Sequence, residues 1–215
     1  MPYITRPMKL EDYRELACMA QLMIEAVPQF DDFERLLVNL KKPGDHKPDV
    51  VPQVYGYVTE FSKTWGDMNN KMIVSSAMLV PTFWVEKIDG SDYLGVSKKY
   101  DYHLTNLMTN PAHRGRGCAK MCLEMVLQWI RQDYTNPNIA VAAWGYPFND
   151  RQNAESLLLD SGFNKIIDEE KIFSRDATED ICGRCPVLNE SCKGSCSLVL
   201  FELINRKDNE KLCVR

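Results

Sequence analysis

The segment from Asn110 to Lys120 combines glycines with basic side chains where a predicted strand ends and a predicted long helix begins. Gly115 and Gly117 allow the backbone to approach a ligand closely, because glycine carries no Cβ. The first turn of the helix leaves N–H groups unpaired and carries the positive end of the helix dipole. These features predict an anion site suited to a pyrophosphate, although a basic turn without a ligand would produce the same pattern. Further positive charge comes from Arg114, Arg116 and Lys120.

The surroundings of this segment favour the ligand-binding interpretation. The segment resembles motif A of the GNAT superfamily of acyl-CoA-dependent N-acyltransferases, written Q/R-x-x-G-x-G/A, which also follows a hydrophobic strand. The matching residues are Arg114, Gly117 and Ala119. A second family signature resembles A-x-x-L-Y-x-x-x-G-F on the next helix. Its matching residues are Ala154, Leu157, Leu158, Gly162 and Phe163. The resemblance runs from about Tyr3 to Phe163.

The resemblance implies how acetyl-CoA would bind. In the family, backbone amides of motif A hold the CoA pyrophosphate, and the preceding strand exposes backbone to the pantetheine and the acyl carbonyl. By position, the residues implied are Leu107, Met108, Thr109, Arg114, Gly115, Arg116, Gly117, Cys118, Ala119 and Lys120. Divergence of the strand at 102–109 from the strand at 139–144 would open a slot for the thioester.

Two positions depart from the family pattern. Leu158 stands where the family often has a tyrosine that protonates the leaving CoA thiolate. Leucine cannot donate a proton, so Tyr146 or water is the expected donor. The frequent asparagine at the start of this helix is matched by Arg151. Its amide contact to the cofactor is therefore assigned to the neighbouring Asn149 and Asn153.

Attack of an amine on a thioester requires a neutral amine, so a base must remove one proton. Some family members carry a glutamate eleven residues before motif A, and that position is His103 here. Histidine titrates near neutrality and suits the role. The alternative is a histidine that is simply hydrogen-bonded at the start of a strand. Asp101 and Glu60 are lesser candidates for the base, and His113 is expected to flank the pyrophosphate loop.

A cysteine cluster with the spacing C-x2-C-x6-C-x3-C occurs late in the chain. Its members are Cys182, Cys185, Cys192 and Cys196. Four thiolates can close a tetrahedral zinc site, although the second half is loosely spaced for a zinc knuckle. An iron–sulfur cluster, disulfides and free thiols remain open. Disulfides are less favoured because the chain has no signal-peptide pattern. The resemblance implies that this loop borders the acceptor side of the active site.

Hydrophobic periodicity predicts the elements that position these residues. Strands are expected at 3–6, 54–59, 72–80, 102–109, 139–144, 171–174 and 197–204. Helices are expected at 10–24, from Asp32 to 40, at 115–134 and at 151–161. The segment 81–99 is either a hairpin extension or a long loop.

The order of elements predicts an α/β fold with a mixed sheet flanked by helices on both faces. The resemblance makes this a GNAT-like, mostly antiparallel sheet. The helical patterns also predict small core residues at Cys18, Cys118 and Cys122.

Length and charge limit the remaining possibilities. With 215 residues, 45% of them hydrophobic, the chain fits one GNAT-like domain, 1–215, with a Cys-rich insertion at about 176–197. A formal net charge of −4 is unlike that of a strongly basic nucleic-acid binder. No run approaches the ~20 apolar residues of a membrane helix, and a cytoplasmic location is expected.

The sequence therefore predicts an N-acetyltransferase that moves an acetyl group from acetyl-CoA to a primary amine by direct attack on the thioester. The acidic balance favours a small-molecule or peptide amine over nucleic acid as the acceptor. One alternative is a non-catalytic acyl-CoA or protein-binding module, which the leucine at position 158 keeps open. Others are an acyltransferase acting on a nucleobase or nucleic acid, and a nucleic-acid-binding protein that uses the cysteine cluster as a zinc ribbon.

Overall fold

A single sheet organises the part of the chain that the computed structural model describes, which is residues 2–24, 30–42, 53–63, 71–82, 100–134, 137–145, 154–169 and 197–204. Within these residues, seven strands pair in the order β1-β2-β3-β4-β5-β7-β6. Only β4 and β5 pair in parallel among them, so the predicted mixed, mostly antiparallel sheet is confirmed. The strands are β1 (Tyr3–Pro7), β2 (Tyr55–Ser62), β3 (Lys71–Pro81), β4 (Tyr102–Thr109), β5 (Ile139–Gly145), β6 (Asn164–Glu169) and β7 (Ser197–Leu203).

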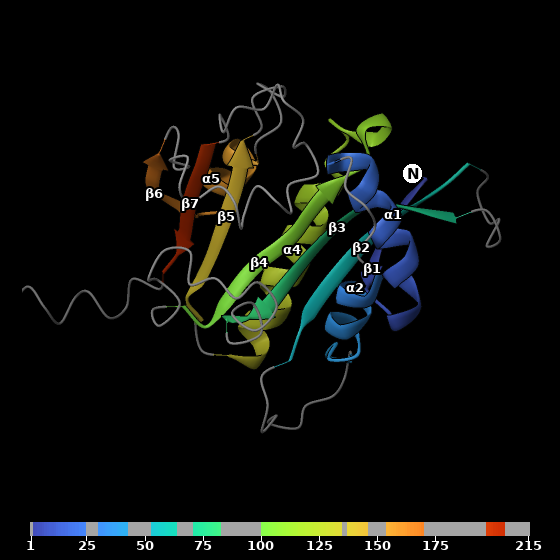
Figure 1. The fold of residues 1–215 in the computed structure, drawn as a ribbon, viewed down its shortest axis with the longest axis horizontal. Helices are drawn as coiled ribbons and strands as arrows, with labels where there is room; N and C mark the ends of the chain where they lie inside the picture. Colours follow the sequence, from blue (N-terminus) through green and yellow to red (C-terminus); the bar gives the residue numbers. More distant parts are fainter. Residues whose placement is uncertain are drawn as a thin grey trace, which may run out of the picture.

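Helices cover both faces of the sheet, as predicted (Figure 1). The helices α1 (Tyr13–Ile24) and α2 (Phe30–Leu37) pack on one face, and α4 (Cys118–Asp133) packs on the other. The shorter helical segments are η1 (Leu10–Asp12), η3 (Pro111–His113) and α5 (Glu155–Asp160). Among the helices of the described ranges, none has the length and apolar character needed to cross a membrane.

Side chains of strand β3 pack alternately into the hydrophobic cores on the two faces of the sheet. Successive side chains of a strand point to opposite faces. Ala77 and Leu79 accordingly join the core under α4, whereas Met78 and Val80 join the core under α1 and α2. The buried residues of α4 recur at helical spacing and are Cys118, Cys122, Leu123, Val126, Leu127 and Ile130. Full burial of a large aliphatic side chain stabilises the fold by roughly 1.5–3 kcal/mol.

Strands β4 and β5 pair only where they begin. Tyr102 lies opposite Ile139, and His103 lies opposite Ala140. Beyond these residues β5 pairs along its length with β7 instead. The two parallel strands therefore diverge toward their carboxyl ends, as Figure 1 shows. The expected divergence of the two strands is confirmed.

Several helices begin at positions other than those expected. Helix α5 begins at Glu155 and not at 151, and α1 begins at Tyr13, after the 3-10 turn η1, and not at 10. Helix α4 begins at Cys118 and not at 115, because Gly115 and Gly117 have φ values of 70° and 77°. Such left-handed conformations are incompatible with a right-handed helix. Helix α2 begins at Phe30, so Asp32 lies in its first turn and not at its N-cap.

The remaining differences from the sequence analysis concern a missed strand, two segments that are not described, and the burial of the cysteines. The strand β6 at Asn164–Glu169 was missed by the periodicity analysis. The strand expected at 171–174 and the segment 83–99 lie outside the described residues. Cys18 was predicted in the core and is exposed, whereas Cys118 and Cys122 are buried as predicted. Cys18 lies on the outer side of α1, between the buried residues Ala17 and Met19.

Helix α5 ends in a way that explains the Gly-Phe pair of the second motif. Gly162 has a φ of 91° and donates its N–H to the Leu159 carbonyl at 3.0 Å. The Phe163 N–H donates to the Leu158 carbonyl at 3.0 Å. This is the Schellman arrangement, in which glycine accepts the left-handed conformation and a hydrophobic residue follows. Phe163 then enters the core beneath α4.

Candidate functional site

A bulge in β4 lies beside the opening between β4 and β5. The register between β3 and β4 shifts between Ser76 and Met78, and Asn106 has a φ of 50°. Asparagine tolerates this left-handed conformation better than most residues. The Ser76 hydroxyl donates to the Asn106 carbonyl at 2.9 Å. A bulge bends its strand and redirects the residues that follow.

The residues after the bulge are fixed to β3 by Ser75. Its hydroxyl donates to the Met108 carbonyl at 2.7 Å and lies 2.9 Å from the Thr109 hydroxyl. The carbonyls of Asn106 and Met108 thus both face β3. Regular alternation of carbonyls along a strand would direct the Leu107 carbonyl between them to the opposite side, toward β5. That direction would present a backbone group where the pantetheine is expected.

The loop from Asn110 to Gly117 leads from β4 into α4. Asn110 anchors its start: its N–H donates to the Val74 carbonyl at 2.8 Å, and its side-chain oxygen accepts from the Ala112 N–H at 3.0 Å. Among the described residues, no atom lies within 4 Å of the position that a Cβ would take at Gly115 or Gly117. The backbone of both glycines therefore borders open space.

The N-terminus of α4 is not capped by a side chain at Gly117. The first N–H groups of a helix have no partner within the helix. The amides from Cys118 to Lys120 therefore point out of the first turn, next to the two glycines. Arg114 is half-buried, and Arg116 and Lys120 are exposed. Lys120 also lies 3.8 Å from Glu124, but both side chains are 59% exposed, so this pair contributes little.

His113 fastens the loop to the sheet. A hydrogen bond of 3.1 Å joins its Nδ1 to the Tyr3 hydroxyl, and its ring lies 4.7 Å from the Phe61 ring, between centroids. Burial, assisted by the positive charge of Arg116, lowers the pKa of His113. His113 flanks the loop as expected, and its contacts are those of a neutral anchor.

His103 occupies the point where β4 and β5 separate. It belongs to the last pair of the short β4–β5 ladder. It lies opposite Val80, whose side chain packs under α1, so the half-buried His103 faces the α1 side of the sheet. The Tyr100 ring stands edge-on to the His103 ring at 6.5 Å. Thr109 lies six residues further along β4, roughly 20 Å at strand spacing.

The two lesser candidates for the base have structural contacts. Asp101 accepts a hydrogen bond from the Asn138 N–H at 2.8 Å and so joins the beginnings of β4 and β5. The carboxylate of Glu60 accepts from Arg6 at 2.6 Å and lies 3.2 Å from the Lys71 ammonium. Burial alone would raise the pKa of Glu60, but these two cations lower it below its ordinary value. Both carboxylates are thus engaged in holding the fold.

Several predicted site residues lie outside the described ranges. They are Tyr146, Asn149, Asn153, Cys182, Cys185, Cys192 and Cys196. Elsewhere in the described ranges, no group of three or more His, Cys, Asp or Glu residues could hold a metal ion. Leu158 is described, and its side chain is fully buried in the core under α4. A tyrosine would have to displace core residues there.

The sequence analysis located Asn110 at the end of the strand without giving it a role, and it missed three other residues that shape the loop from beneath. Asn110 and Asn106 set its start and the bulge, and Ser75 and Ser76 hold the β4 backbone. An asparagine before a proline is a turn signal, and it located Asn110. The two serines have no local signal, because their partners are about 30 residues away in the chain.

Comparison with known proteins gives matches at the level of structure. Neither protein-family models nor curated protein sequences match the chain. Arabidopsis thaliana NAA60, solved in complex with acetyl-CoA, aligns with a TM-score of 0.57 at 12% identity, covering 94% of this chain and 98% of that one. A GNAT-family acetyltransferase from Streptococcus pneumoniae gives a TM-score of 0.56 at 11% identity, covering 94% and 99%.

A third similar structure is a spermidine/spermine N-acetyltransferase from Vibrio cholerae. Its TM-score is 0.51 at 15% identity, and the alignment covers 98% of this chain and 97% of that chain. All three similarities extend over nearly the whole chain. They are similarities of fold, and the fold expected from the two motifs is confirmed.

Proposed function

Because the chain has the GNAT fold, we propose that it transfers an acetyl group from acetyl-CoA to a primary amine. One observation carries the proposal. An uncapped helix N-terminus, preceded by two left-handed glycines that border open space, lies at the carboxyl end of a strand that diverges from its parallel neighbour. This arrangement offers an anion site and an adjoining slot to one extended molecule.

Acetyl-CoA fits this arrangement from one end to the other. The pyrophosphate would accept hydrogen bonds from the amides of 116–120, next to Gly115, with Arg114 and Arg116 supplying positive charge. The pantetheine would then follow β4 from Thr109 past Leu107 toward the narrow end of the opening. Asn149 and Asn153 would add amide contacts to the cofactor from the segment before α5.

At the narrow end, the reaction is a direct attack on the thioester. The amine nitrogen forms a bond to the acetyl carbonyl carbon, the carbon–sulfur bond breaks, and CoA leaves as a thiolate. His103 would take the proton that the amine loses, because it lies where the two strands separate. Tyr146 or water would protonate the thiolate, since Leu158 is a core residue.

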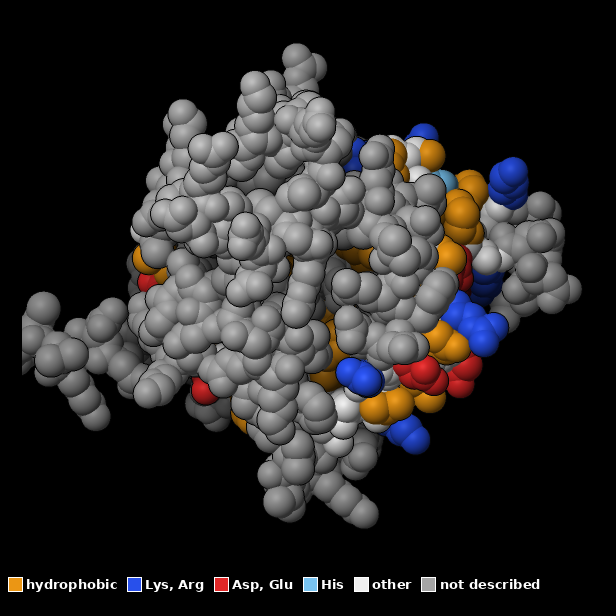
Figure 2. All heavy atoms as spheres, viewed as in Figure 1, with side chains coloured by type: hydrophobic (Ala, Val, Ile, Leu, Met, Phe, Trp, Pro, Cys, Tyr) orange, Lys and Arg blue, Asp and Glu red, His pale blue; other side chains and the backbone are white. Residues whose placement is uncertain are grey.

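The acceptor is proposed to be a small-molecule or peptide amine. One similar fold belongs to a spermidine/spermine N-acetyltransferase, whose named substrates are polyamines. On the described part of the face shown in Figure 2, basic and acidic side chains are interspersed. Such a mixed surface, with a formal net charge of −4, suits a cationic amine better than a polyanionic nucleic acid.

A non-catalytic acyl-CoA-binding module is the second candidate. The observation that favours it is Leu158, which cannot protonate a thiolate and which is fully buried in the core. Such a module would bind acetyl-CoA with the same loop and release no CoA in the presence of any amine.

The two candidates are separated by incubating the protein with acetyl-CoA and a panel of amines while free CoA is measured with a thiol reagent. The chain has eight cysteines, so reactions without acceptor and without acetyl-CoA are required blanks. Acceptor-dependent CoA release, with an acetylated product detected by mass spectrometry, would support the enzyme. Acetyl-CoA binding without release across polyamines and peptide N-termini would support the binding module.

The cysteine cluster is proposed, from its sequence alone, to hold one zinc ion beside the acceptor. Cys182, Cys185, Cys192 and Cys196 would supply the four thiolates. Elemental analysis of protein purified without added metal tests this. Zinc or iron below about a tenth of an equivalent, with four freely titrating thiols, would leave the cluster without a metal.

A further inference from the structure

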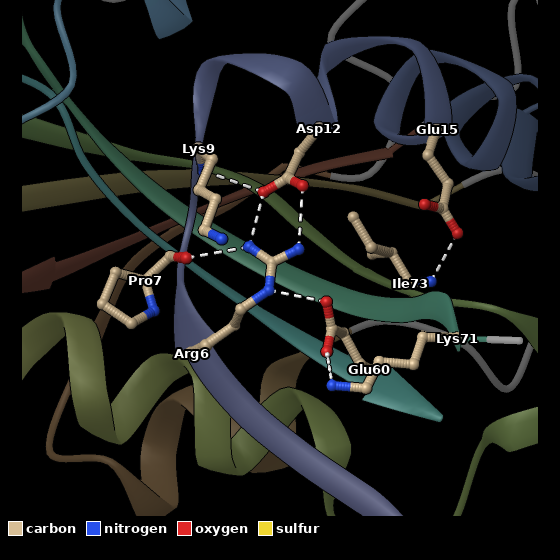
Figure 3. A network of polar contacts seen from close by, with 8 residues as sticks. All are labelled: Arg6, Pro7, Lys9, Asp12, Glu15, Glu60, Lys71 and Ile73. Atoms are coloured by element: carbon tan, nitrogen blue, oxygen red, sulfur yellow. Dashed lines mark hydrogen bonds and ion pairs between the residues drawn. The ribbon is translucent and has the colours of Figure 1, made fainter. Parts of the chain in front are cut away.

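A helix side chain holds a main-chain donor of the sheet at the edge of the candidate CoA site. Glu15, in the first turn of α1, accepts a hydrogen bond from the Ile73 N–H near the beginning of β3, at 2.5 Å (Figure 3). In a regular antiparallel ladder, N–H groups donate to the neighbouring strand. Here the donor points to a carboxylate from another layer of the fold.

The Ile73 N–H is available because β3 contains a bulge at this point. Thr59 lies opposite Ser75, and Glu60 lies opposite Ile73, so Val74 is the additional residue. A bulge leaves its extra residue without a partner on the adjacent strand. The Val74 carbonyl accepts instead from the Asn110 N–H at 2.8 Å.

This bulge supports the start of the loop that is proposed to bind pyrophosphate. Asn110 is the first residue of that loop, and its side chain orders the turn through the Ala112 N–H. Ser75, which follows Val74, holds the last two residues of β4. Three consecutive residues, 73 to 75, therefore connect α1 on one side with the end of β4 and the loop on the other.

An ion-pair network fixes the beginning of α1 over this bulge, as Figure 3 shows. Arg6 donates to both oxygens of Asp12 at 2.8 Å and to Glu60 at 2.6 Å. Lys71 lies 3.2 Å from the other oxygen of Glu60. The network links η1, β1, β2 and the first residue of β3. Glu15 follows Asp12 by three residues, which is nearly one helical turn. The approach of Glu15 to Ile73 is therefore set by the fold around it.

Glu15 is an exposed residue, yet its carboxylate is partly shielded from water. This desolvation raises the pKa of Glu15, and the negative charges of Asp12 and Glu60 act in the same direction. The hydrogen bond from Ile73 opposes the rise. The carboxylate thus stays at the bulge despite an electrostatic cost, favoured by the Ile73 N–H and, more weakly, by the positive charge of Arg6.

We propose that Glu15 is a positioning residue for acetyl-CoA binding. By holding the Ile73 N–H it fixes the bulge, and the bulge presents the Val74 carbonyl that anchors Asn110. Glu15 acts through the backbone and touches no part of the cofactor. This inference rests on the proposed function, because it assumes that the loop after Asn110 binds acetyl-CoA.

The test is calorimetric titration of acetyl-CoA into the intact protein and three variants. Glu15→Gln keeps an oxygen acceptor at the same reach, so its Kd should stay within about twofold of the wild type. Glu15→Ala removes the acceptor and should raise Kd about tenfold, as expected when a hydrogen bond to a charged group is lost. Glu11→Ala is the control, because Glu11 is an exposed acidic residue of the preceding η1 segment.

A second measurement separates positioning from general stability. Both Glu15 variants lose a negative charge at a helix N-terminus and should unfold at a somewhat lower temperature. Only Glu15→Ala should accelerate hydrogen exchange at the Asn110 amide, which Glu15 does not touch. If Glu15→Ala fails to fold, Glu15→Asp replaces it, since it keeps the charge and falls one methylene short of Ile73.

The outcomes are distinct. Wild-type Kd and Asn110 exchange in Glu15→Ala or Glu15→Asp would overturn the positioning role and leave the acetyl-CoA site intact. Failure of the wild-type protein itself to bind acetyl-CoA would overturn the proposed function, and the positioning role with it. A tenfold rise in Kd that Glu15→Gln does not show would support both.

Discussion

Cys118 contributes to two environments at once. Its amide lies in the first turn of α4 beside the two glycines, while its side chain is buried against the sheet. Burial raises the pKa of the Cys118 thiol, and it raises the pKa of Cys122 to about 11. Protonated, buried thiols are poor nucleophiles. Thiol chemistry is therefore not expected of Cys118, and its proposed part in the site is that of its backbone amide.

The three described cysteines outside the cluster should differ in their rates of alkylation in the folded protein. Cys18 is exposed and should react readily with a maleimide. Cys118 and Cys122 should react at least about tenfold more slowly, because reaction requires opening of the core. Peptide mass spectrometry over a time course measures the rates, with a denatured sample as the control. Fast labelling of Cys122 in the folded protein would contradict the packing of α4.

His113 should make the fold and the loop sensitive to mild acid. The pKa of His113 in the folded state lies below its ordinary value of 6.5. Between these two pKa values the folded state therefore binds fewer protons than the unfolded state. Its contribution is complete above about pH 6.5 and is lost as the pH falls through the folded pKa. The Tm of the wild type should therefore fall between pH 7 and pH 5.

The control for this prediction is His113→Phe, which keeps an aromatic ring against Phe61 and cannot titrate. The difference between the two Tm profiles isolates His113 from the carboxylates. Parallel profiles over this range would show that His113 is not the group responsible.

At the scale of elements, α5 and the turn after it depend on one glycine. Gly162→Ala places a Cβ on a residue with a φ of 91°, which costs roughly 1–2 kcal/mol for an L-residue. The space itself is available, since the nearest atom, of Leu203, would lie 3.8 Å from the new Cβ. Chemical denaturation measures the loss in the free energy of unfolding. A change below a few tenths of a kcal/mol would mean that the Schellman turn is not rigid.

The elements that could be predicted from the sequence are those with a clear internal pattern. Helix α4 shows a helical stripe, and β4 is bounded by the Asn-Pro turn, so both were located within a few residues. Strand β6 has the sequence NKIIDE, which does not alternate and carries charges at three of six positions. Its strand conformation follows from pairing with β7, which lies about 30 residues later in the chain.

In the candidate site, too, the residues with a local sequence signal could be predicted, and those that depend on distant contacts could not. The glycines and cations of the loop are local signals, and they correctly indicated where backbone meets open space. The supports of the loop depend on contacts between distant segments, such as Asn110 with Val74 and Glu15 with Ile73. No periodicity or motif encodes these pairs. Sequence reasoning therefore locates the loop sooner than the residues that hold it in place, and ligand binding by the loop stays a prediction.

At the scale of the whole molecule, the sheet consists of two parts joined by a short ladder. Strands β1 to β4 form one part and β5, β7 and β6 the other, and two residue pairs connect them. A ligand lying in the opening would contact both parts. It would stabilise the folded state by mass action, because the unfolded chain has no such site.

Acetyl-CoA should accordingly raise the Tm of the protein. At a concentration of 100 times Kd the stabilisation is about 2.7 kcal/mol. For a chain of this size, that corresponds to a rise of roughly 5–11 °C. Differential scanning fluorimetry with acetyl-CoA measures the shift, and adenosine, which lacks the pyrophosphate and pantetheine, is the control. A shift of equal size with both compounds would indicate nonspecific stabilisation.

The most direct test of the central claim is calorimetric titration of acetyl-CoA into the wild type and two matched glycine variants. Gly117→Ala and Gly162→Ala each add a Cβ at a positive φ, so both lose stability for the same reason. Only Gly117 borders the proposed pyrophosphate site. The account predicts one acetyl-CoA per chain, wild-type Kd for Gly162→Ala, and at least about a tenfold weaker Kd for Gly117→Ala. Equal affinities in the two variants, or no binding by the wild type, would contradict it.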